Sequence, residues 1–159
     1  MIRVATMIDA HCELCQSDGG ELLYRGPHYR VVRVTGSEGD SYPGFCRVIW
    51  NAHVKEMSDL GEADRQLLMG AVFRVEAALR FSLQPKKINL ASLGNMTPHL
   101  HWHVIPRLTG DPTFPKPIWA ADVAQPQQID KLINKSEIRN VDAHVEWAGT
   151  VRNALNNNG

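Results

Sequence analysis

Three histidines, His99, His101 and His103, alternate with apolar residues in one short segment that ends at Pro106. Successive side chains of a β-strand point to opposite faces, so this pattern predicts a strand with three imidazoles on one face and apolar residues on the other. Each ring has a polar nitrogen that needs a partner, and protonating one ring disfavours protonating the next. The row therefore indicates a site for a metal ion or an anion.

The spacing of the imidazoles bears on which of the two they would bind. Alternate residues of a strand lie roughly 6.6 Å apart, whereas zinc–nitrogen bonds are about 2.0–2.1 Å long. Two such rings can converge on one metal, but three on a flat strand rarely do. A phosphate beside the row needs only hydrogen-bond donors and one unprotonated ring nitrogen, with the central ring, that of His101, as nucleophile.

A second motif, Cys12-Glu13-Leu14-Cys15, places two thiols close together near the N-terminus. Three cysteines do not make a disulfide framework in a chain of this length, and the spacing of this pair is typical of metal binding or redox chemistry. The third, Cys46, lies among strand-forming residues and is most simply a small buried group. The pair alone leaves metal binding and redox chemistry open.

Hydrophobic period and turn residues predict the elements that carry these motifs. Five segments have the composition of short strands: residues 21–25, 28–34, 45–50, 88–93 and 100–105, the last ended by Pro106. The first three form an antiparallel meander, with turn residues over 35–41. Between the third and fourth, apolar positions at helical spacing predict a long amphipathic helix from about residue 60 to 82.

The C-terminal part is weakly patterned. After Arg107 the chain is rich in proline and is expected to run extended over the surface to Trp119. A helix over 125–133, a strand over 142–147 and disorder over the last four residues are predicted. We expect residues 1–108 to form the domain core and residues 109–159 to pack as a tail on that same single domain.

Composition excludes several classes of protein. The 159 residues include 17 Lys+Arg and 17 Asp+Glu, so the net charge is zero and no broad cationic surface is available for duplex nucleic acid. The sequence contains no apolar run of the roughly 20 residues that a membrane span needs, and its first residues lack the features of a signal peptide. We therefore expect a cytoplasmic protein that binds neither duplex nucleic acid nor membrane.

The segment 99–105 resembles the signature of the histidine triad (HIT) family, in which three histidines alternate with apolar residues, and Pro98 and Pro106-Arg107 resemble that family's flanks. The similarity extends over about residues 12–108, through the cysteine pair, the Pro43-Gly44 turn, His53-Val54 and the long helix. It implies an α+β fold with a five-stranded antiparallel sheet and one long amphipathic helix, here with a C-terminal extension. It also implies a homodimer.

The resemblance further implies a nucleotide substrate, with hydrolysis or transfer at the α-phosphate. His101 would form a covalent nucleotidyl-histidine, and His103 would contact the phosphate oxygens and the leaving group. His53 would lie near the triad, where it orients His101 or binds metal. His99 is also expected beside the substrate. In the short loop before the triad, two residues are available as donors to the phosphate or leaving group, or simply make the turn: Asn95 and Thr97.

In relatives with the N-terminal cysteine pair, the resemblance implies a structural zinc site. Its ligands here would be two thiols and two imidazoles, namely Cys12, Cys15, His53 and His99. The alternative is an unmetallated, reduced pair of thiols. No organic cofactor is expected.

The sequence leaves the substrate and two further residues open. The bond cleaved would be that of a dinucleoside polyphosphate or of a nucleoside phosphoramidate, while the rival hypotheses are a non-catalytic nucleotide-binding adaptor and a zinc-stabilised interaction protein. Arg107 is a candidate phosphate clamp or a surface residue. Trp119 folds back over the site, packs onto a partner subunit or packs on its own sheet edge.

Overall fold

A computed structural model describes residues 7–120 and 141–157. Its strands form one antiparallel sheet in the order β1-β2-β3-β5-β4. The strands are β1 (Glu21–Arg25), β2 (Tyr29–Arg33), β3 (Cys46–Trp50), β4 (Lys87–Ala91) and β5 (His101–Arg107). The helices are α1 (Glu13–Gln16), α2 (Gly36–Ser41), α3 (Glu62–Leu83) and α5 (Val141–Asn156), with the 3-10 helix η1 (Met57–Asp59). The predicted α+β fold with a five-stranded antiparallel sheet is confirmed.

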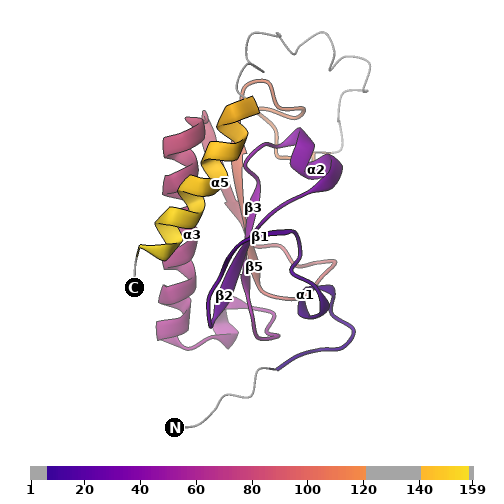
Figure 1. Ribbon diagram of the computed structural model, residues 1–159. Coiled ribbons are helices and arrows are strands. Elements are labelled where there is room, and N and C mark those ends of the chain that lie inside the picture. Colours follow the sequence, from indigo (N-terminus) through magenta and orange to yellow (C-terminus); the bar gives the residue numbers. More distant parts are fainter. Residues whose placement is uncertain (1–6, 121–140, 158–159) are drawn as a thin grey trace.

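The two faces of the sheet have different roles. Figure 1 shows α3 and α5 side by side along one face, and α1 and α2 lie toward the other. The main apolar core lies under α3, where Val48, Trp102 and Val104 meet the buried side of that helix. Alternate residues of the same strands therefore face α1 and are available to build a site.

Strand β5 continues through Pro106, where the sequence had predicted its end. Proline lacks an N–H and interrupts a ladder only where a partner carbonyl faces it. The pairing of β3 with β5 ends at Cys46 and Val104, so the β3 side of Pro106 faces no ladder bond. Pairing with β4 continues to Arg107, whose carbonyl accepts the N–H of Lys86 at 3.0 Å.

The C-terminal prediction of a strand over 142–147 is wrong, because this segment belongs to helix α5. Trp147, Val151 and Leu155 recur every four residues and are buried in the main core, against α3 and β1. This spacing places them on one helical face. The helix predicted over 125–133 lies outside the described residues, and the division at residue 108 stays a prediction.

Two connections also differ from the expected loops. The turn-rich segment after β2 forms the short helix α2 instead of an irregular turn. The proline-rich segment after β5 is anchored by Arg107, whose guanidinium is buried in an ion pair with Asp111 at 2.7 Å and also donates to Asn89, Thr113 and the Lys116 carbonyl. Across residues 7–120 and 141–157, no helix combines the length and apolarity needed to cross a membrane.

Candidate functional site

The three triad histidines lie on the face of the sheet opposite α3, as the alternation predicts. His99 lies two residues before the first residue of β5, and His101 and His103 are within the strand. Across the sheet, His101 is opposite Ile49 and His103 is opposite Arg47 of β3. Because directly opposed residues in antiparallel strands have neighbouring side chains, β3 supplies the floor beside the triad.

A main-chain carbonyl determines the tautomer of His101. Its Nδ1 lies 2.5 Å from the carbonyl oxygen of His99. A carbonyl only accepts, so Nδ1 must carry the proton, and the neutral ring is left with its lone pair on Nε2. The residue is 7% exposed. Burial lowers the pKa of His101, and the charge of Arg47 lowers it further, against the opposing effect of the carbonyl bond. His101 is therefore a neutral imidazole whose free nitrogen can act as a nucleophile.

His99 has the opposite tautomer for the same physical reason. Its Nε2 lies 2.6 Å from the carbonyl oxygen of Trp50, so Nε2 carries the proton and Nδ1 carries the lone pair. That Nδ1 lies 3.4 Å from the Cys12 Sγ and 3.5 Å from the Cys15 Sγ. The first histidine of the triad thus faces the cysteines with its side chain, while its main-chain carbonyl holds His101.

His103 completes the reactive face of the strand. Its ring centroid lies 4.8 Å from that of His101 and 5.5 Å from that of Phe45. Burial, followed by the charges of His101 and Arg47, lowers the pKa of His103 to about 3. Its Nδ1 is buried and has no hydrogen-bond partner among the described residues. At neutral pH this ring is uncharged and retains an unsatisfied nitrogen.

A cavity of about 580 Å³ opens beside His101 and His103. The loop 93–97, which includes both predicted donors, Asn95 and Thr97, lines the same cavity, as does Trp119. Trp119 also lines a second cavity beside the edge strand β4, so it lies between the site and the sheet edge. The other lining side chains come from α1 and β3: Glu13, Leu14 and Arg47. The cavity size suits a small ligand.

Two lining residues, Glu13 and Arg47, were missed by sequence reasoning. Arg47 is a lone charge in the apolar run of β3, a signal that a buried polar contact is required there. Arg107, in contrast, had been a candidate clamp, but its donors are bound to Asp111, Asn89 and the following loop. It anchors that loop and does not line the cavity beside His101.

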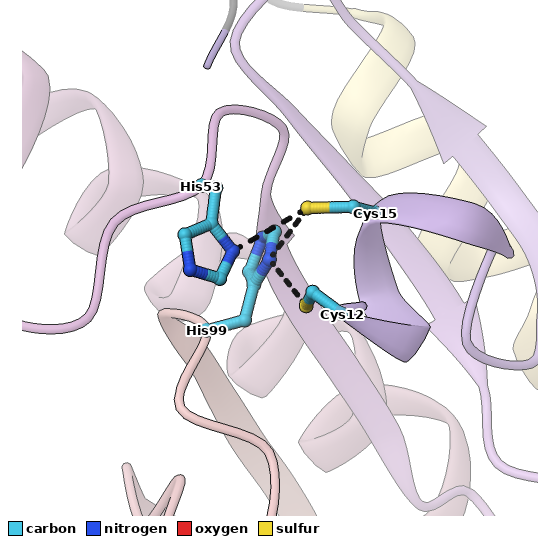
Figure 2. Close-up of side chains that lie close together, drawn as sticks. All are labelled: Cys12, Cys15, His53 and His99. Atoms are coloured by element: carbon cyan, nitrogen blue, oxygen red, sulfur yellow. Dashed lines mark hydrogen bonds between the residues drawn. The ribbon is translucent and has the colours of Figure 1, made fainter. Parts of the chain in front are cut away.

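Four potential metal ligands gather next to this cavity. Figure 2 shows Cys12 and Cys15 of the α1 segment, His53 after β3 and His99 before β5 pointing toward one another. One ligand atom from each residue lies within 4.8 Å of all the others. The Cys15 Sγ lies 3.4 Å from the Nδ1 of His53. Residues separated by up to 87 positions thus form a single cluster.

The supports of this cluster are polar contacts outside it. The buried Arg30 donates from Nη2 to the Leu14 carbonyl at 2.6 Å and to the Ser17 carbonyl at 3.2 Å, which holds α1 against the sheet. Asp9 lies 3.7 Å from the Nε2 of His53 through Oδ2. Such outer contacts orient side chains that ligate a metal. Arg30 and Asp9 were also missed from sequence.

The fold and site define an α+β protein with a histidine-lined cavity beside a Cys₂His₂ cluster. The family model described as the HIT domain matches residues 22–110, more than half of the chain. The chain belongs to the HIT family.

Solved structures agree with this assignment. A histidine triad protein from Bradyrhizobium japonicum is 27% identical, with a TM-score of 0.64 and 87% of this chain and 92% of that chain covered. One from Marinobacter aquaeolei has a TM-score of 0.67 at 20% identity, covering 94% and 97%. A hypothetical histidine triad nucleotide-binding protein from Sulfolobus tokodaii has a TM-score of 0.51 at 18% identity, covering 87% and 85%. No match was found among curated proteins.

The lowered pKa of His103 predicts a pH dependence of stability. Between about pH 3 and the ordinary histidine value of roughly 6.5, the unfolded ring binds a proton and the folded ring does not. The free energy of unfolding therefore falls as pH drops below about 6.5, by up to about 1.4 kcal/mol per pH unit from this ring. Urea unfolding of wild type and His103→Gln between pH 7 and 5 measures the effect. A shallower slope is expected in the variant, and equal slopes would contradict it.

Proposed function

We propose that this protein is a nucleotide hydrolase or transferase that acts at a nucleoside α-phosphate through a covalent nucleotidyl group on His101. The observation that carries the proposal is the hydrogen bond from the His101 Nδ1 to the His99 carbonyl, which leaves Nε2 unprotonated beside a cavity of about 580 Å³. Membership of the HIT family supports a nucleotide as ligand.

The reaction would take place in two displacements at phosphorus. The Nε2 lone pair of His101 attacks the α-phosphorus, a P–N bond forms, and the bond from phosphorus to the leaving group breaks with its electron pair departing on that group. Water, or another acceptor in a transferase, then attacks the same phosphorus, loses a proton and releases His101 with its lone pair restored. Asn95 and Thr97, together with His103, are proposed to contact phosphate oxygens.

The protonation state of His103 favours one leaving group over another. Its pKa of about 3 makes it a poor proton donor at neutral pH. A polyphosphate leaves as an anion and needs no proton, whereas an amine leaving from a phosphoramidate does. In the ligand-free protein this property suits a polyphosphate leaving group, and a phosphate bound against His103 would raise its pKa, so we propose a dinucleoside polyphosphate or a nucleoside phosphoramidate as substrate.

Substitution of His101 tests the covalent step. After wild type is mixed with diadenosine tetraphosphate or adenosine phosphoramidate and quenched in denaturant, intact-mass measurement should detect one added nucleoside monophosphate. In His101→Gly the adduct should be absent and kcat/KM should fall at least about a thousandfold, because the attacking nitrogen is lost.

The matched control is His11→Gln, which alters an exposed histidine outside the site. It should form the adduct like wild type. The proposal is wrong if wild type forms no adduct and turns over no nucleotide, or if His101→Gly remains active. Nucleotide binding without turnover in wild type would instead favour the non-catalytic adaptor.

We also propose that Cys12, Cys15, His53 and His99 bind a structural zinc ion. Tetrahedral zinc with bonds of about 2.3 Å to sulfur and 2.0–2.1 Å to nitrogen separates sulfur from nitrogen ligands by about 3.5 Å. Three of the four sulfur–nitrogen distances here are 3.4, 3.4 and 3.5 Å, and the fourth, between Cys12 and His53, lies within the 4.8 Å that spans the whole cluster. The donor set therefore fits. All four positions would be taken by protein, so the ion would supply a structural link between α1 and the triad strand.

Metal analysis of untagged, unheated protein tests this assignment. About one zinc per chain is expected in wild type, and much less in the double variant Cys12→Ser/Cys15→Ser, because both thiolate ligands are removed. Cys46→Ala is the matched control, since it removes a buried thiol outside the cluster and should retain zinc. Less than a tenth of a zinc per wild-type chain would leave the reduced thiol pair as the correct interpretation.

A homodimer is the proposed assembly. Strand β4 lies at one edge of the sheet. Exposed apolar side chains lie on and after it, at Leu90 and Leu93, and Trp119 is exposed as well. An unpaired strand edge with apolar neighbours is suited to pairing with a second copy.

A further inference from the structure

Arg47 occupies a special position beside the reactive histidines. It lies on β3 directly opposite His103, on the face of the sheet that bears the triad. Its side chain lines the cavity of about 580 Å³ next to His101, and it also lines an adjoining cavity of about 350 Å³ that contains Gly19 and Glu38. Arg47 therefore lines both cavities, and the two partners of its guanidinium, Gly19 and Glu38, line the smaller one.

Arg47 also supplies a charge that the site otherwise lacks. Among the described residues lining the larger cavity it is the only lysine or arginine. A guanidinium keeps its charge at every physiological pH, unlike an imidazole. An anion bound beside His101 would share the cavity with this positive charge and with the carboxylate of Glu13.

The side chain is incompletely satisfied in the absence of a ligand. Nη2 donates to Glu38 Oε2 at 3.1 Å, and Nη1 donates to the Gly19 carbonyl at 3.4 Å. Nε is buried and has no hydrogen-bond partner in the described part of the chain, as is also true of Nδ1 in the opposite residue, His103. Arg74 Nε and Trp147 Nε1 are unpaired as well within the described chain, but only Arg47 and His103 are cross-strand neighbours that line one cavity, which indicates that this pair has hydrogen-bonding capacity left for a ligand.

We infer that Arg47 binds the non-bridging oxygens of the phosphate that reacts at His101. The inference rests on the proposed function and adds a binding residue to it. Guanidinium N–H groups match phosphate oxygens in geometry and form charge-assisted hydrogen bonds. Because these oxygens stay with the nucleotide, Arg47 holds the substrate, the covalent nucleotidyl group and the released nucleoside monophosphate alike.

This role predicts selective recognition of the phosphate. Calorimetric titration with each of the four common nucleoside 5′-monophosphates and the matching nucleosides separates the phosphate contribution from that of the base and ribose. Arg47→Met should weaken monophosphate binding about 10- to 100-fold and leave nucleoside binding unchanged, since charge-assisted hydrogen bonds are lost while the side-chain volume is largely kept. The monophosphate affinity of Arg47→Lys should lie between those of wild type and Arg47→Met, because the charge remains and the planar guanidinium is lost.

The matched control is Arg33→Met. Arg33 is a β2 arginine outside the larger cavity, paired with Glu21 at 3.4 Å. Its loss changes the net charge equally and should leave monophosphate binding at the wild-type level. Thermal unfolding of each variant checks that the fold is retained. If Arg47→Met does not fold, the monophosphate affinity of Arg47→Lys is compared with that of wild type instead.

The outcomes separate this inference from the proposed function. If monophosphate affinity is unchanged in Arg47→Met, or nucleoside affinity falls equally, Arg47 is not a phosphate ligand even if His101 forms its adduct. If wild type binds monophosphate through Arg47 but never forms the adduct, the covalent function fails and the binding role stands. No binding of any monophosphate by wild type would overturn the inference about Arg47, while the covalent function would still be decided by the adduct at His101.

Discussion

The site depends on two main-chain carbonyls that each fix one imidazole. The carbonyl of Trp50 accepts from the Nε2 of His99, and the carbonyl of His99 accepts from the Nδ1 of His101. Because a carbonyl cannot donate, the neighbouring rings are held in opposite tautomers, with free nitrogens at Nδ1 in one and Nε2 in the other. The segment that enters β5 thereby presents His99 to a cluster of thiols and His101, the first residue of the strand, to a cavity.

The remaining structure holds these two carbonyls in place. Pairing of β3 with β5 fixes where the strands lie, and the apolar side chains beneath α3 secure that pairing from the opposite face. On the site face, Arg30 binds the carbonyls at the end of α1 and so carries the cysteines to His99. The proposed zinc and the proposed nucleophile would be linked through one residue, because His99 offers its side chain to the cluster and its carbonyl to His101.

Much of this could be predicted from sequence where a local rule decides the outcome. The alternation of histidines with apolar residues placed the triad on one face of the strand, and the helical spacing of apolar residues predicted α3 to within a few residues of its ends.

Prediction from sequence failed where contacts between residues far apart in the chain determine the local structure. Pro106 stays in β5 because β3 has already ended, and α5 forms where Trp147 and Val151 meet α3, while its N-terminal half had looked like a strand. Arg107 and Arg47 could not be told apart by type, since only the fold shows that the first is bound by Asp111 and the second lines the cavity. The proximity of the cysteines to His53 and His99 came from the family resemblance, as the residues alone do not specify it.

The central claim is that His101 is neutral, with its proton on Nδ1 and its lone pair on Nε2. Long-range nitrogen–proton correlation spectra of the imidazole rings at pH 7.5 test it directly, because protonated and unprotonated ring nitrogens differ in chemical shift. Assignment is made by comparison with His101→Gly. The account predicts a protonated Nδ1 and an unprotonated Nε2 for His101. A proton on Nε2, or a doubly protonated ring at that pH, would contradict it.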